Sequence, residues 1–277
     1  MSTLEQLIQK IWNYRSKHRR TMAWRTDTRP YYIVVSEIML QQTQVDRVTR
    51  KFESFIARFP DWQTLACAPT KEVLQEWSGL GYNRRALYLK RIAETITNNE
   101  KGSGELPRSF DQLRELPGIG PNTAGSILAF AYNIPHPFIE TNIRSVFIEH
   151  FFKRSRKKVS DAQLMPLIEK SLLHTKNKKN PREWYYALMD YGSHLKKQTS
   201  NPSRRSTHHI KQKPFKGSNR ELRSRILRLV LERPMKAEDI FEYFKKEKIE
   251  RVKLEKNLRD LVKEGFLMVH NKTYSIK

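Results

Sequence analysis

A glycine-flanked turn between two helical segments constrains what this chain can fold into. Residues 116–132, LPGIGPNTAGSILAFAY, place Gly118 and Gly120 just before an Ala- and Ser-rich helical stretch. Glycine allows positive φ angles and lets another backbone approach without a side-chain clash. The N-terminus of the second helix presents unpaired N–H groups, which favour an anion such as a phosphate. The turn therefore predicts a phosphate-binding helix pair, and a plain helix–helix turn is the alternative.

The charge balance points to a polyanionic partner. Lys and Arg number 53 and Asp and Glu number 29 among 277 residues, so the formal net charge is +24. Nucleic acid is the first candidate, and a solvated basic surface is the alternative. The single cysteine, Cys67, excludes a disulfide framework and a cysteine-rich metal site within the chain. No window approaches the ~18 consecutive apolar residues of a membrane span, so we expect no membrane partner.

The chain divides by composition into three parts. Residues 1–198 have apolar positions at helical spacing, which predicts an all-α domain. Residues 199–219 are polar and basic, which is typical of a linker. Residues 220–277 predict three helices and a hairpin of two short strands around Asn271 and Lys272. That order resembles a winged helix, a small α/β module that either places its third helix in the DNA major groove or docks a protein.

Four segments together carry a family resemblance: MAWRTDTRPYYIVVSEIMLQQTQVDRV, WSGLGYNRRALYLKRIAE, LPGIGPNTAGSILAFAYNIP and YYALMDYGSHL. With these segments in order, residues 1–198 resemble the helix-hairpin-helix DNA glycosylases and are most similar to the adenine glycosylase (MutY) branch. The resemblance implies an all-α fold of two helical subdomains with double-stranded DNA bound across the cleft. It also implies that the target nucleotide is flipped out of the stack into a pocket.

The resemblance also implies which residues meet DNA. Gln42 and Tyr82 would probe or wedge the base stack, because Tyr offers a flat stacking face and Gln offers both a donor and an acceptor. A packed aromatic at a helix end is the alternative for Tyr82. Trp24 and Arg25 match a segment that helps line the base pocket. The remaining expected DNA contacts are Leu80, Gly81, Arg84, Gly118, Gly120, Thr123, Lys196 and Lys197.

Two acids are the candidate catalytic residues. Cutting an N-glycosidic bond requires a proton for the leaving base and a charge that stabilises the cationic sugar, and related glycoside chemistry uses two carboxyl groups. Glu37 lies in the apolar stretch YYIVVSEIML, where burial would raise its pKa; the resemblance places the family's proton donor here, and a helix cap is the alternative. Glu140 stands where the family has the sugar-stabilising Asp, with its charge moved by about 1.5 Å. This change predicts a reshaped pocket, a different substrate or a different reaction.

Asn122 marks a position at which bifunctional relatives have a Lys that attacks the sugar and forms a Schiff base. Asn cannot do this, so the motif predicts a monofunctional enzyme. A free amine elsewhere, such as Lys90, remains a source of weak strand cleavage.

Two further departures concern the segments after residue 195. The family's four-cysteine iron–sulfur loop is replaced by KKQTSNPSRRSTHH, so we expect no cluster and no other cofactor. Lys196, Lys197, Arg204 and Arg205 are candidates to replace the phosphate contacts of that loop. The hairpin carbonyls are a candidate cation site. The Nudix-like domain common in adenine glycosylases is replaced by the winged-helix-like module.

The sequence thus predicts a clusterless, monofunctional DNA glycosylase that hydrolyses the bond to a flipped-out base, with adenine in a mispair as the first choice. One alternative keeps the fold and acts at abasic sites or on another damaged or mismatched base. Another is a non-catalytic DNA-damage binding protein. The expected partner is double-stranded DNA with a lesion or mispair, and the family's example favours a monomer. The expected location is the cytoplasm with the nucleoid in a bacterium or archaeon, and the nucleus in a eukaryote.

Overall fold

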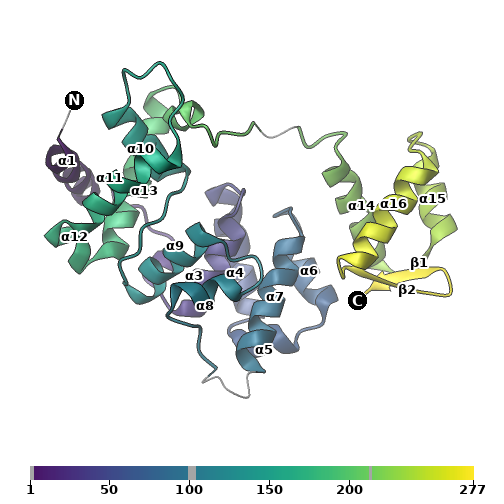
Figure 1. The fold of residues 1–277 in the computed structure, drawn as a ribbon. Coiled ribbons are helices and arrows are strands. Elements are labelled where there is room, and N and C mark those ends of the chain that lie inside the picture. The colour runs from purple at the N-terminus through teal and green to yellow at the C-terminus, as the bar shows by residue number, and fades with distance from the viewer. Residues whose placement is uncertain (1–2, 99–103, 212–213) are drawn as a thin grey trace. The chain divides into compact units, whose positions relative to one another are not determined.

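The computed structural model describes residues 3–98, 104–211 and 214–277, and helices dominate it (Figure 1). The chain forms two compact units. Unit 1 comprises residues 1–37 and 106–211, and unit 2 comprises residues 38–105 and 212–277. Among the described residues, no helix is long and apolar enough to cross a membrane. The predicted fold class, mainly α with a small C-terminal sheet, is confirmed.

Unit 1 is built around one long helix near the end of its chain segment. Its elements are α1 (Leu4–Lys17), α2 (Ala23–Thr26), most of α3 (Pro30–Leu40), α8 (Phe110–Glu115), α9 (Pro121–Tyr132), α10 (Thr141–Phe151), α11 (Asp161–Leu173), α12 (Thr175–Lys179), α13 (Pro181–Gln198) and the 3-10 helix η1 (Pro202–Arg205). Helix α13 contacts α1, α9 and α10. Its buried Tyr185 packs with Phe130 and Phe138, and its buried Trp184 meets Trp12 of α1, which gives the unit an aromatic core.

The glycine turn joins α8 to α9 as predicted. Gly118 has φ +76, which only glycine adopts readily. Gly120 has φ −88 and lies at the N-cap of α9, so its backbone does not need the positive φ that the sequence suggested. A Cβ at Gly120 would meet open space, so the turn keeps an uncovered backbone there. Pro121 follows at the first helical position, where its missing N–H costs nothing.

Unit 2 combines four central helices with the C-terminal module. Its elements are the end of α3, α4 (Val45–Arg58), α5 (Trp62–Cys67), α6 (Thr70–Trp77), α7 (Arg84–Thr97), α14 (Asn219–Glu232), β1 (Met235–Lys236), α15 (Ala237–Lys245), α16 (Arg251–Lys263), β2 (Leu267–His270) and β3 (Thr273–Ile276). Helix α4 is strongly amphipathic and buries Val48, Phe52 and Phe55. Phe55 meets Trp77 of α6 edge to face, which anchors α4 on α6.

The C-terminal module has the predicted three helices and hairpin. Asn271 and Lys272 both have positive φ, as a two-residue turn between twisted strands requires. The sheet has a third strand that the sequence did not suggest: β1 pairs with β3, giving the antiparallel order β1-β3-β2. A strand of two residues, Met235–Lys236, is too short to show an alternating pattern, which is why it escaped prediction.

The first part of the expected linker is packed structure. In η1, Pro202 and Ser203 are buried, and Ser206 forms an isolated parallel β-bridge with Val159. Arg205 donates hydrogen bonds to the carbonyls of Phe152 and Ser155. Residues 199–206 therefore belong to the packing of unit 1, with Arg205 serving an internal role rather than presenting its guanidinium to a phosphate.

Candidate active site

The expected site residues fall into two groups, one in each unit. Unit 1 holds the candidate catalytic residues Glu37, Glu140 and Asn122 and the expected base-pocket residues Trp24 and Arg25. It also holds the expected DNA contacts Gly118, Gly120, Thr123, Lys196 and Lys197. Unit 2 holds Gln42 and Tyr82, expected to probe the base stack, and the other expected DNA contacts Leu80, Gly81 and Arg84.

Glu37 is built to hold a proton near neutral pH. It lies on α3 in a run of buried apolar residues. Desolvation by the surrounding protein raises its pKa to about 7. The Ser126 hydroxyl, which donates to Glu37 Oε2 at 2.5 Å, opposes this rise, and the nearby charge of Glu140 adds to it. A carboxyl group in this state is suited to general acid catalysis.

Glu140 is the N-cap of α10. Its Oε1 accepts hydrogen bonds from the backbone N–H groups of Asn142 at 2.8 Å and Ile143 at 3.1 Å. Its Oε2 accepts from the Asn142 side chain at 3.3 Å. These bonds pin the longer acid against the first turn of its own helix, where the helix dipole favours negative charge. The position of the charge is therefore fixed by the helix end and not left to a flexible side chain.

Asn122, at the start of α9, positions the segment that leads to Glu140. Its Oδ1 accepts a hydrogen bond from the Ile139 N–H at 3.1 Å. One turn later on the same face, a Cβ on Gly125 would lie 2.9 Å from Phe138 Cβ, so this segment lies close against α9. Helix α9 thus links the glycine turn at its N-terminus to the segment that leads to Glu140. Thr123 is half-buried between these two positions.

Gly192 sets the approach of α13 to the first turn of α10. A Cβ at this position would lie only 2.4 Å from the Asn142 carbonyl oxygen, so no larger residue fits without moving a backbone. The helix that carries Lys196 and Lys197 therefore contacts the same turn that Glu140 caps. Lys196 is half-buried and Lys197 is exposed.

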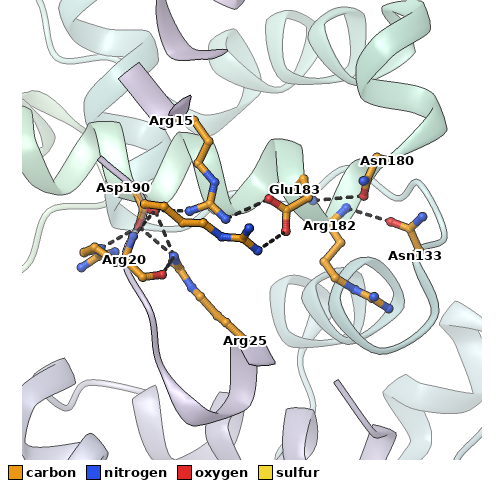
Figure 2. Close-up of polar contacts among 9 residues, drawn as sticks. Arg15, Arg20, Arg25, Asn133, Asn180, Arg182, Glu183 and Asp190 are labelled. Carbon is orange, nitrogen blue, oxygen red and sulfur yellow. Dashed lines mark hydrogen bonds and ion pairs between the residues drawn. The ribbon is translucent and has the colours of Figure 1, made fainter. Parts of the chain in front are cut away.

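An ion network surrounds Asp190 on α13 (Figure 2). Arg25 is almost fully buried, donates to both Asp190 oxygens at 2.9 and 3.0 Å, and lies over the Tyr186 ring at 4.4 Å. Asp190 also accepts from Arg15 at 2.5 Å and from Arg20 at 2.6 Å. Burial lowers the pKa of Arg25, and Asp190 opposes that change. This network fixes the guanidinium that the resemblance placed in the base pocket.

Trp24, the other expected pocket residue, is buried on α2 with 4% of its surface exposed. Asp190 was not expected as a site residue, although it lies inside the quoted segment YYALMDYGSHL. A lone acid among aromatic and apolar residues was the available signal.

Two candidate DNA contacts in unit 2 have strained backbones. Gln42 has φ +55 and Tyr82 has φ +47, and neither is glycine. Gln42 lies between α3 and α4, and Tyr82 follows Gly81 between α6 and α7. Such conformations cost roughly 1–3 kcal/mol and are concentrated at functional sites. Leu80 is buried, so its side chain packs inside the protein.

Arg85, on α7, holds both turns together. Its guanidinium is buried and donates to the carbonyls of Ile38 at 2.8 Å, Gln41 at 2.6 Å and Gly81 at 3.0 Å. Burial lowers its pKa to about 10, so the group remains charged at neutral pH. Its neighbour Arg84, the DNA contact expected from the sequence, is exposed and pairs with Glu264 at 2.7 Å.

Arg85→Met is expected to lower the free energy of unfolding by roughly 3 kcal/mol, because several buried carbonyl oxygens lose their donor. Urea unfolding followed by circular dichroism measures this change. Arg84→Met is the matched control and should cost less than about 1 kcal/mol, since the Arg84 side chain is exposed. Equal stability of the two variants would contradict the role given to Arg85.

The C-terminal module touches the Tyr82 turn within unit 2. Arg220 of α14 donates to the Tyr82 hydroxyl at 2.6 Å, and its guanidinium lies 5.4 Å from the ring centre. The Arg84–Glu264 pair adds a second contact. The module therefore contributes to the surface around the candidate stacking residue.

Lys90, the free amine named above as a source of weak strand cleavage, has other contacts. The Lys90 amine donates to the Ala66 carbonyl at 2.7 Å and pairs with Glu94 at 3.0 Å, so it is committed to packing in unit 2.

An iron–sulfur cluster needs four thiolates, and the segment after α13 provides none. The one cysteine, Cys67, is exposed on α5 in the other unit. The segment after α13 and Cys67 therefore do not fit a four-thiolate cluster.

Residues 35–170 match the family model described as HhH-GPD superfamily base excision DNA repair protein. This range includes both candidate acids, the hairpin and the strained turns. The part of the chain that carries both candidate acids therefore belongs to the helix-hairpin-helix DNA glycosylase superfamily.

Within that superfamily the chain is similar to the adenine glycosylase (MutY) branch. It is 38% identical over 177 residues to the adenine DNA glycosylase of Buchnera aphidicola subsp. Baizongia pistaciae, covering 63% of this chain and 48% of that protein. It is 41% identical over 129 residues to the adenine DNA glycosylase of Mycolicibacterium smegmatis, covering 46% and 43%. The chain thus spans about half the length of the curated relatives it matches.

Solved structures support the fold. A thermostable thymine-DNA glycosylase has a TM-score of 0.58 at 22% identity, covering 69% of this chain and 86% of that chain. A trapped endonuclease III–DNA covalent intermediate has a TM-score of 0.55 at 18% identity, covering 78% and 92%. At these identities the likeness establishes the fold and not the substrate.

Proposed function

We propose that this protein is a clusterless DNA glycosylase that hydrolyses the N-glycosidic bond of a flipped-out base, with adenine in a mispair as its substrate. The observation that supports this best is the pair of acids in unit 1. Glu37, with a pKa of about 7, protonates the leaving base. The Glu140 carboxylate, pinned at the N-terminus of α10, offsets the cationic sugar. Water attacks the sugar, because Asn122 offers no amine at the family's nucleophile position.

Adenine is proposed because the curated relatives at 38% and 41% identity are named adenine DNA glycosylases. The buried pair Trp24 and Arg25 supports a base pocket in this unit. Asp190 holds one guanidinium nitrogen of Arg25, which fixes the orientation of the group, and we assign its remaining N–H donors to a base edge. Recognition of the opposite base is assigned to unit 2, where Gln42 and Tyr82 have positive φ.

A panel of duplexes tests this proposal. Each contains one mispair or lesion: adenine opposite guanine, cytosine or 8-oxoguanine, or uracil or thymine opposite guanine. Mass spectrometry measures free base, and gels with and without alkali measure strand breaks. Release of adenine, with alkali adding to the breaks, supports the proposal. Release of a different base contradicts the substrate, and tight binding with no released base contradicts the enzyme activity.

DNA affinity is expected to fall steeply with salt. The runs 153–158 and 176–179 have exposed lysines and arginines, and each phosphate they neutralise adds about −0.9 to the log–log slope. With about six contacts, affinity drops roughly a thousandfold between about 50 and 200 mM salt. Fluorescence anisotropy on a fixed duplex measures the slope. Lys157→Gln combined with Lys158→Gln should make it shallower by about 1.8. A flat response in the wild type would exclude these runs from the DNA contact.

The purified protein is expected to be colourless and free of iron. The loop that holds the family's cluster has no cysteine here, and Arg205 and η1 close that segment by hydrogen bonding and packing. Elemental analysis and a visible absorption spectrum measure this. Iron in stoichiometric amount would contradict the proposal of a clusterless enzyme.

A further inference from the structure

The C-terminal module is bonded to two residues that the sequence predicted to meet DNA, and all of these contacts lie within unit 2. Arg220 of α14 donates to the Tyr82 hydroxyl at 2.6 Å. Glu264, at the C-cap of α16, pairs with Arg84 at 2.7 Å and with Arg223 of α14 at 2.6 Å. Tyr82 and Arg84 stand together at the start of α7, so the module meets this turn at two neighbouring points.

The contact at Tyr82 is one with which DNA competes. The Arg220 guanidinium lies over the Tyr82 ring, 5.4 Å from its centre. A nucleobase that stacks on tyrosine uses the flat face of the same ring. Arg85 also lies over this ring, at 5.5 Å, but it is held by the buried carbonyls of Ile38 and Gln41. Of the two arginines, Arg220 is therefore the one that can give way to a base.

A cavity of about 1020 Å³ lies between the Tyr82 turn and α14. Among the described residues that line it, one is an acid, Glu264, and six are arginines: Arg47, Arg84, Arg85, Arg220, Arg223 and Arg228. So much positive charge around one space opposes the closed arrangement and attracts a polyanion. A contact made of polar bonds around a cavity also opens at a lower cost than a close-packed apolar one.

We propose that the C-terminal module is an autoinhibitory lid on the Tyr82 turn, and that DNA opens the lid when its phosphates take over Arg84 and Arg220. A phosphate is the better partner, because it offers charged oxygens in place of a phenol and can bind a guanidinium through two hydrogen bonds. The inference rests on the proposed function for the DNA contact of this turn. It adds a regulation, since the fraction of molecules with a closed lid lowers the apparent DNA affinity.

A positioning role for Arg220, which would hold Tyr82 ready to stack, is the competing explanation. The two explanations predict opposite signs for Tyr82→Phe, a change that keeps the ring for stacking and removes only the hydroxyl that Arg220 binds. With a lid, the variant should bind DNA about fivefold more tightly, because loss of a charge-assisted hydrogen bond enlarges the open fraction. With a positioning role, the variant should bind more weakly.

The experiment measures the affinity of the full chain for a duplex with one tetrahydrofuran abasic analogue, so that it does not depend on base release. Fluorescence anisotropy gives the dissociation constant. Glu264→Gln should also tighten binding, by about threefold, because the lid loses its ion pair with Arg84. Glu247→Gln is the matched control: it changes the charge of the same module equally, but its partner is Arg225 and it does not line the cavity. It should change affinity by less than about twofold.

Fluorescence energy transfer between Cys67, which is exposed on α5, and a label on Lys277→Cys follows the lid itself. Transfer should fall when the duplex is added, and it should already be lower in Tyr82→Phe before DNA is present. Unchanged transfer at saturating duplex, equal or weaker binding by Tyr82→Phe, or equal effects of the two glutamate variants would each overturn the inference.

Base release from the adenine mispairs, measured on the same proteins, keeps the two proposals apart. Tighter binding and lid opening without base release from any duplex would sustain the lid and refute the proposed function. Base release by wild type, with no change of affinity in Tyr82→Phe, would sustain the proposed function and refute the lid.

Discussion

Glu37→Gln is expected to abolish base release, by roughly a thousandfold, while DNA binding stays near wild type. The amide has the shape of the carboxyl group but no proton to donate, so the loss falls on the chemical step. Single-turnover base release at saturating enzyme measures the rate, and anisotropy on the same duplex measures binding. Wild-type rates from a folded, DNA-bound variant would show that Glu37 is not the acid.

The pH profile gives an independent check on the same group. Desolvation raises the pKa of Glu37 to about 7, so the active, protonated form is fully populated well below that pH and is lost above it. Base release should therefore fall about tenfold per pH unit above pH ~7. Ser126→Ala removes a hydrogen bond that lowers this pKa, so the fall should move to higher pH. A rate independent of pH in both proteins would contradict the assignment.

Features that depend on neighbours in sequence were predictable. The apolar run around Glu37 predicted a buried acid with a raised pKa; the residue is half-buried, and desolvation raises its pKa as expected. The glycine turn predicted the α8–α9 pair, with Gly118 in the left-handed region. Both depend on helical spacing and glycine chemistry, which a single sequence displays directly.

Features that depend on distant contacts were not predictable. Ser126 meets Glu37 across 89 residues, Arg85 meets Ile38 across 47, and Asp190 meets Arg25 across 165. Each is a polar side chain in a buried place, but a sequence does not show which partner satisfies it. The requirement for glycine at position 192 is hidden in the same way, because it comes from Asn142 on another helix. The sequence therefore did not show which residues position the candidate site.

The second large effect is expected at Glu140. Glu140→Gln should be severely impaired in base release, because a neutral amide cannot offset a cationic sugar. Its carbonyl oxygen can still accept the N–H groups of Asn142 and Ile143, so the helix cap costs at most about 1 kcal/mol. A melting temperature close to wild type, measured beside the single-turnover rate, assigns the loss to charge. An unimpaired rate would remove Glu140 from the chemistry.

Glu140→Asp then tests whether the pocket has been rebuilt around the longer acid. Asp caps helices well, so the variant should fold and α10 should keep its cap. The charge, however, withdraws by about 1.5 Å, the length of one methylene. Because Asn142 and Ile143 hold the longer side chain in place and Asn122 fixes the backbone before it, we expect a loss of roughly a hundredfold or more. If the variant instead keeps or increases the wild-type rate, the site still suits the family's Asp, and Glu140 is a replacement that the pocket tolerates without having adapted to it.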